Sequence, residues 1–137
     1  MIIVDTNVWR EISHAQGNQR VKQWFVERES ELLLSSIVLS EMLYGVCKMD
    51  EGRRKQLMLG WYERLEAEFS DRILDYDRKC ASAYGVLANE IRLQGLDTGA
   101  MDAMIAAQAV ANEAAIATRN TKDFAFAGIA VVDPWVV

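Results

Sequence analysis

The sequence predicts an α/β protein in which helices cover both faces of a five-stranded, mainly parallel sheet. Five short apolar runs have the length and composition of buried strands. Longer segments with helix-forming composition and apolar residues at helical spacing lie between these runs. Strands that alternate with helices are typical of parallel sheets, because each parallel connection crosses over a face of the sheet. A three-layer α/β/α sandwich is therefore expected.

The expected elements follow one another along the whole chain. The apolar runs predict strands over 1–4 (MIIV), 31–35 (ELLLS), 72–76 (RILDY), 114–118 (AAIAT) and 129–132 (IAVV). The intervening segments predict helices over 18–29, 36–49, 53–69, 77–94 and 98–112. The chain contains no repeat, linker or low-complexity segment, and its one proline, Pro134, lies near the end. With 137 residues, 51% of them apolar, a single domain over 1–137 is expected to bury a sizeable core.

Composition limits the compartment and the chemistry. The chain has no basic leader, and no window approaches the roughly 18 apolar residues of a membrane-spanning helix, so a cytoplasmic protein without a membrane partner is expected. The two cysteines, Cys47 and Cys80, are far apart within apolar helical patterns, which favours buried thiols over a disulfide framework or a thiolate metal site. The net charge is −5, whereas proteins that bind nucleic acids are usually basic, so the charge alone argues against a nucleic-acid partner.

Asp5 directly follows the first expected strand and is the first ionisable side chain of the sequence. Functional groups of open parallel sheets gather outside the carboxyl ends of the strands, which is where Asp5 would lie. Asp123 follows the expected strand 114–118 by a few residues and would reach the same edge. Arg119 and Lys122 flank Asp123, so its pattern alone is also that of a surface acid.

Two further acids stand alone on apolar helices. Glu41 is the only ionisable carboxylate between Leu32 and Cys47, and Asp102 is the only charge between 98 and 112, about one turn inside a helix that Thr98 would cap. A buried ionised carboxylate is costly unless it is paired, hydrogen-bonded or bound to a metal. Three separate segments thus carry the same unfavourable feature.

Each acid also has an ordinary structural explanation. Asp5 would cap the following turn, Glu41 would face solvent, Asp102 would complement a helix N-terminus, and Asp123 would begin a turn. The four together are more specific, because carboxylates without basic partners repel one another unless a divalent cation neutralises them. Oxygen ligands favour Mg²⁺ or Mn²⁺, and the single histidine, His14, excludes a multi-histidine zinc site. His14 is expected in a solvated loop.

Four segments in order, MIIVDTNVW, LSEMLYGV, TGAMDAMIAAQA and ATRNTKDF, resemble the signature blocks of PIN-domain ribonucleases. The similarity is to the VapC/FitB-type toxins of bacterial type II toxin–antitoxin modules, and it spans almost the whole chain. It implies a PIN-like sandwich. It also implies a catalytic, metal-binding set and a supporting polar set, formed respectively by Asp5, Glu41, Asp102 and Asp123, and by Thr6, Asn7, Thr118 and Asn120.

The resemblance further implies a metal-dependent endoribonuclease, a homodimer, and inhibition by a cognate VapB-type antitoxin. Enteric relatives cut transfer RNA, although this sequence does not display its own target. The chemistry fits, since one or two Mg²⁺ or Mn²⁺ ions held by carboxylates activate water without a side-chain nucleophile. Four of the five units of net negative charge then belong to the site, and nearby Arg10, Arg119 and Lys122 either position backbone phosphates or are ordinary surface cations.

Three other protein classes share part of this pattern. A response-regulator receiver needs an acid beside Asp5 and a lysine where this chain has VDPW, and a haloacid-dehalogenase-type phosphatase needs an aspartate where this chain has Asn7. A PIN-like RNA- or protein-binding module without catalysis is the remaining alternative, and a nuclease assay with and without Mg²⁺ discriminates it.

The segment RRKQLMLGWYERLEAEF carries large apolar side chains at helical spacing. Such a stripe either belongs to the core or forms a groove for an antitoxin or a second protomer. Its members are Leu57, Met58, Trp61, Tyr62, Leu65 and Phe69.

Overall fold

The computed structural model describes residues 1–137 and contains one five-stranded sheet. The strands are β1 (Ile2–Val4), β2 (Leu32–Ser35), β3 (Ile73–Leu74), β4 (Ala115–Ala117) and β5 (Val131–Val132). Their order across the sheet is β3-β2-β1-β4-β5, and every neighbouring pair is parallel. The predicted parallel sheet is therefore confirmed, with β1 at its centre.

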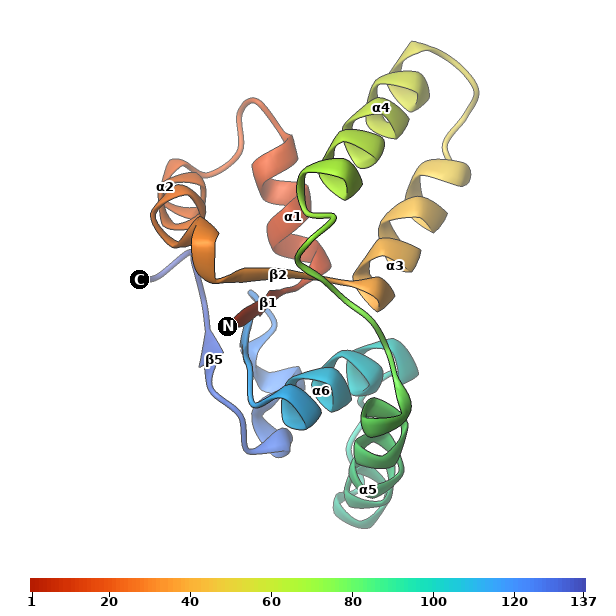
Figure 1. Cartoon of the computed structure of the whole chain (residues 1–137), viewed down its shortest axis with the longest axis vertical. Coiled ribbons are helices and arrows are strands. Elements are labelled where there is room, and N and C mark those ends of the chain that lie inside the picture. Colours follow the sequence, from red (N-terminus) through yellow and green to blue (C-terminus); the bar gives the residue numbers. More distant parts are fainter.

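Helices cover both faces of this sheet, as predicted for a three-layer sandwich (Figure 1). On one side lie α1 (Thr6–Ser13), α2 (Gln19–Arg28), α3 (Ser36–Cys47) and α4 (Arg53–Glu68). On the other side lie α5 (Arg78–Gln94) and α6 (Ala100–Asn112). Short 3₁₀ turns are η1 (Glu29–Glu31), η2 (Thr121–Asp123) and η3 (Ala125–Ala127). None of the helices is long and apolar enough to cross a lipid bilayer.

The core lies against the three central strands. Completely buried side chains include Ile3, Val4, Leu32, Leu34 and Ile116. Because parallel strands are covered on both faces, their apolar runs are continuous rather than alternating. This rigid centre fixes the positions at which β1 and β4 end, and the polar residues that follow these strands are held beside each other.

An aromatic cluster fixes α1 to its neighbours. Trp9 is fully buried, and its ring meets Phe25 of α2 at 5.4 Å and Phe69 at 5.2 Å, both edge-to-face. Trp9 Nε1 donates a hydrogen bond to the carbonyl of Val4. The beginning of α1 is thereby locked against the end of β1.

The structure differs locally from the sequence-based expectations. Residues 6–13 form α1, although no helix was predicted there, because Asp5 caps the segment and the buried side chains of Val8 and Trp9 hold it against the core. The N-cap of α6 is Gly99, not Thr98, and no side chain caps that helix. Cys47 is exposed rather than buried, because it lies on the outer side of α3, whereas Cys80 is buried as expected.

Candidate active site

Asp5 lies at the carboxyl end of β1 and caps α1. Only 5% of its surface is exposed. Its Oδ1 accepts a hydrogen bond from the backbone N–H of Thr6 at 2.8 Å, which satisfies one of the free donors of the helix N-terminus. Its Oδ2 accepts from Thr118 Oγ1 at 2.8 Å and from Asn7 Nδ2 at 3.3 Å. The carboxylate is thus held in one orientation by three donors.

Polar residues after β4 complete this arrangement. Thr118 is fully buried and directly follows β4, which pairs with β1. Its hydroxyl oxygen also accepts hydrogen bonds from Asn7 Nδ2 at 3.1 Å and from the backbone N–H of Asn120 at 3.0 Å. Asn7 Oδ1 accepts in turn from the backbone N–H of Arg119 at 3.2 Å. The network joins the segments after β1 and β4 across 111 residues of sequence.

Glu41 is half-buried on α3 and contacts the same region through Thr6. The Thr6 hydroxyl donates a 3.0 Å hydrogen bond to Glu41 Oε1. Burial raises the pKa of Glu41, the bond from Thr6 opposes that effect, and the charge of Asp5 adds to it. Two adjacent residues therefore position two carboxylates. Asp5 carries one of them, and Thr6 donates a hydrogen bond to the other, that of Glu41.

Asp102 is half-buried in the first turn of α6. Burial, followed by the charges of Asp5, Glu41 and Asp123, raises its pKa to about 6. Neither a hydrogen bond nor a cation opposes these effects. Asp102 thus has no partner that compensates its charge.

Asp123 is exposed and ends the turn η2. Its charge contributes to raising the pKa of Asp5 and of Asp102, so it lies close enough to act on both. The largest effect on Asp5 is burial, which raises the pKa, while its hydrogen bonds and Arg10 lower it. The four sequence-predicted acids therefore share one electrostatic environment, with Asp123 on its open side.

The donor set fits a hard divalent cation. All four candidate ligands are carboxylates, the type that Mg²⁺ and Mn²⁺ prefer. None of the three ion pairs of the chain includes any of them. No group of three acidic, histidine or cysteine side chains lies close enough together to hold an ion by itself.

A comparison with protein families decides the relationship of this chain. The PIN domain family matches residues 2–130. The chain belongs to the PIN-domain family. All eight residues predicted from the sequence for the site of this PIN domain lie within the matched region.

Relatives place this PIN domain beside VapC/FitB-type proteins. The plasmid stability protein StbB of Pseudomonas syringae pv. tomato is 37% identical over 98% of this chain and 99% of its own. The VapC ribonuclease Y4jK of Sinorhizobium fredii is 34% identical, with 98% of each chain covered. The crystal structure of FitAcB from Neisseria gonorrhoeae contains a chain with a TM-score of 0.92 and 32% identity, with both chains fully covered.

A buried polar contact of this PIN domain was missed by the sequence analysis. Ser35 Oγ caps α3 and donates a hydrogen bond to Gln108 Oε1 of α6, while Gln108 Nε2 donates to the carbonyl of Leu74 at 2.9 Å. Ser35 and Gln108 are both fully buried. The available signal was one uncharged polar residue, Gln108, in the otherwise apolar run AMIAAQAVA.

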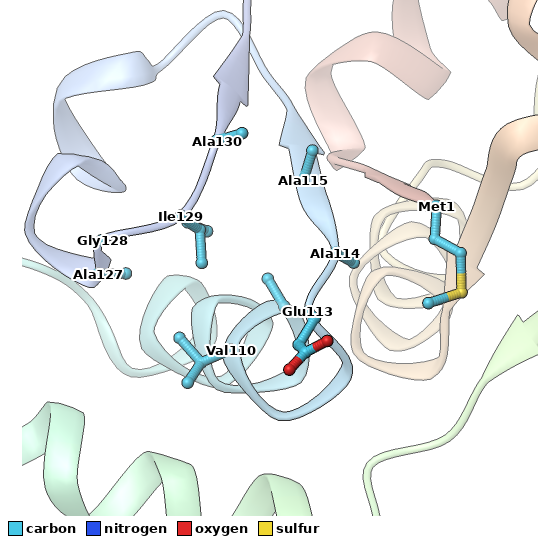
Figure 2. A pocket seen from close by; sticks show the side chains of 10 residues that line it. Met1, Val110, Glu113, Ala114, Ala115, Ala127, Gly128, Ile129 and Ala130 are labelled. Atoms are coloured by element: carbon cyan, nitrogen blue, oxygen red, sulfur yellow. The ribbon is translucent and has the colours of Figure 1, made fainter.

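An apolar pocket of about 520 Å³ lies away from these acids (Figure 2). Met1, Ala115 and Ala130 border it at the amino ends of β1, β4 and β5, whereas Asp5 and Thr118 follow the carboxyl ends. Glu113 is its one charged lining residue. The pocket therefore lies at the opposite edge of the sheet from the candidate active site.

Proposed function

We propose that this protein is a metal-dependent endoribonuclease toxin that is inhibited by a cognate VapB-type antitoxin. The observation that carries the proposal is the placement of four carboxylates, from the segment after β1 and from α3, α6 and η2, in one environment without an ion pair. Ribonuclease activity in the VapC relative supports the same reading. The proposal includes a single domain over residues 1–137 and a homodimer in the cytoplasm.

The proposed ligands have distinct tasks. Asp5 and Asp102 hold Mg²⁺ or Mn²⁺ directly or through water, and Asp123 completes a second, more open position. A bound ion supplies an activated water and stabilises charge on the phosphate and the leaving oxygen. Glu41 binds the ion or orients the attacking water. Thr118 and Asn7 keep Asp5 aimed at the site, and Thr6 does the same for Glu41.

Chelation tests this function most directly. We expect cleavage of labelled transfer RNA with Mg²⁺ or Mn²⁺, no cleavage in excess EDTA, and poor activity with Zn²⁺, because hard oxygen ligands select the first two ions. Gel electrophoresis of the RNA products measures the outcome, with restored Mg²⁺ as the control for irreversible inactivation. Full cleavage in chelator contradicts the mechanism. RNA binding without cleavage in either condition supports a non-catalytic PIN-like module instead.

The antitoxin is proposed to cover the exposed part of the apolar stripe on α4. Tyr62, Leu65 and Phe69 are buried and belong to the core, whereas Leu57 is 60% exposed and Trp61 is half-buried. The VapBC and FitAB complexes among the structural neighbours support a partner of this kind.

Substitution of Trp61 tests this surface. We expect Trp61→Ala to weaken binding of the antitoxin at least about tenfold, because truncating a central aromatic side chain of an interface typically costs 1–3 kcal/mol or more. Calorimetric titration measures the affinity, and Val86→Ala on exposed α5 is the control. Unchanged antitoxin binding and unchanged dimerisation of Trp61→Ala exclude the stripe as the docking surface.

A further inference from the structure

A second pocket, of about 320 Å³, lies between α1, α3 and α4. Its walls combine flat or flexible apolar side chains with cations and include no acidic residue. The side chains that matter below are Arg10, Lys48 and Arg54, and Met42, Met58 and Trp61. Such a lining is unusual in a chain whose net charge is −5. We call it the basic pocket.

None of the cations of the basic pocket forms an ion pair within the chain. The three ion pairs of the protein involve Arg28, Lys55 and Arg72, none of which lines this pocket. Lys48 lies 5.1 Å from the ring centroid of Tyr44 and has no carboxylate partner. Lys48 and Arg54 therefore face the pocket without a counter-charge, and such cations attract an anion.

The basic pocket adjoins the candidate active site. Arg10 lines the pocket, and its charge also lowers the pKa of Asp5 and of Glu41. Arg10 Nη2 lies 4.0 Å from the position that a β-carbon would occupy at Gly45, one helical turn after Glu41. Met42, which also lines the pocket, directly follows Glu41. The two sites therefore share a wall formed by α1 and α3.

An RNA substrate must approach a site that is itself acidic. Carboxylates repel the phosphates of a polyanion, so cations beside the acids have to supply the attraction. The basic pocket places Lys48 and Arg54, which have no carboxylate partner, next to an indole ring, and adds Arg10 on the side of the acids. Nucleotides offer that combination of charge and shape, with phosphates for the cations and a flat base for the aromatic surface.

We propose that the basic pocket is a substrate subsite that holds a nucleotide flanking the cleaved phosphate of the RNA. Lys48 and Arg54 contact its backbone phosphates, and the base lies against Trp61 and Met58. Arg10 lies between this nucleotide and the acids. The inference rests on the proposed ribonuclease function and adds the surface by which the substrate is bound. An antitoxin on α4 would share Trp61, so substrate and antitoxin are expected to compete.

Binding of fluorescently labelled total transfer RNA tests the subsite. The measurement uses the full chain with Asp102→Asn, to prevent cleavage, over a range of salt concentrations. Adding Lys48→Ala and Arg54→Ala is expected to raise Kd about tenfold and to reduce the salt dependence by the contribution of about two phosphate contacts. Arg78→Ala with Lys79→Ala is the matched control, because these exposed residues lie on α5, across the sheet, and remove the same charge.

The aromatic contact has its own pair of variants. Trp61→Ala is expected to raise Kd about tenfold, and Trp61→Phe to restore most of the affinity, because a phenyl ring still stacks on a base. Melting temperatures of all variants establish that they are folded. In the background with Asp102 intact, Lys48→Ala with Arg54→Ala should raise KM much more than it lowers kcat.

Two results overturn the subsite. One is an equal loss of RNA affinity in the α5 control, which means that net charge alone determines binding. The other is unchanged RNA affinity of the variant with Lys48→Ala and Arg54→Ala. If this variant also binds the antitoxin more weakly, the pocket belongs to an acidic protein segment. Both presuppose that the unsubstituted chain cleaves RNA. Absence of that cleavage contradicts the proposed function itself and is therefore a distinguishable failure.

Discussion

The junction of β1 and α1 and the first turn of α6 each bring one aspartate to the same site, but they hold it differently. Asp5 is almost fully buried and accepts three hydrogen bonds, one from its own helix and two from side chains. Asp102 is half-buried, and only burial and three acidic neighbours act on its pKa. The first region is built to orient a charge, while the second leaves its charge to be compensated from outside.

This difference suggests that one aspartate of the site contributes to folding and the other to binding of a cation. A carboxylate with three donors contributes to the folded state whether or not an ion is bound. A carboxylate without donors gains its favourable interactions when a cation arrives. We therefore expect substitutions in the two regions to divide between effects on stability and effects on activity.

The largest effect is expected for Asp102→Asn. The substitution keeps the size of the side chain and removes an anionic ligand, so RNA cleavage should fall at least about 100-fold. Melting temperature without metal should hold or rise, because repulsion from the other acids is relieved. The increase in melting temperature on adding Mg²⁺ should shrink.

Asp97→Asn is the control for Asp102→Asn, since it removes the same charge from an exposed position five residues earlier. Cleavage assays and thermal unfolding with and without Mg²⁺ measure the outcome. If Asp102→Asn unfolds the protein, or changes neither cleavage nor the Mg²⁺ effect, then Asp102 is a structural acid.

A smaller effect, on stability, is expected for Asp5→Ala. The variant leaves the Thr118 hydroxyl, the Asn7 amide and the Thr6 N–H without their acceptor, which should lower the free energy of unfolding by about 2 kcal/mol. Urea denaturation measures this difference. Asp102→Ala provides the comparison and should not lower stability, because Asp102 accepts no such bonds. Equal stabilities of the two alanine variants would contradict the contrast between the regions.

The smallest effect is expected from pH. The pKa of Asp102 is about 6 in the folded protein and 3.8 as a free group, so the folded chain binds this proton more tightly. Without metal, the contribution of Asp102 to stability should therefore improve as pH falls from 7 through 6 towards 4. The gain should not exceed about 1 kcal/mol, because solvent screens a half-exposed group.

Melting temperature against pH, in EDTA, separates this contribution from those of other acids. The unsubstituted protein should gain relative to Asp102→Asn as pH falls, and Mg²⁺ should stabilise it less at pH 5 than at pH 7, because protons compete with the ion. Parallel curves for the two proteins would show that Asp102 titrates normally.

The sequence predicts the parts of this fold that depend on local pattern. The apolar runs located all five strands. Because parallel strands have their carboxyl ends at one edge of the sheet, the sequence also predicted that Asp5 and Asp123 lie near each other. The helix α1 was not predicted, because its eight residues include Asn7 and the β-branched Thr6 and Val8, and burial of Trp9 outweighs their weak helix propensity.

Side-chain contacts between distant segments were beyond the sequence. Glu41 was recognised as an isolated charge, but its bond to Thr6 depends on how α3 crosses the end of β1. The basic pocket likewise joins residues from three helices that no periodicity relates. The positions of the acids could be anticipated, whereas their partners depend on packing.

The contact between Ser35 and Gln108 sets a distance that matters elsewhere. Glu41 lies six residues after Ser35 on α3, and Asp102 lies six residues before Gln108 on α6, so each acid is about 9 Å along its helix from the shared bond. This buried contact joins α3 to α6 and so helps to fix the distance between the carboxylates of Glu41 and Asp102. Substitution of Ser35 or Gln108 is therefore expected to change the distance between Glu41 and Asp102 without changing the protein surface, because both residues are fully buried.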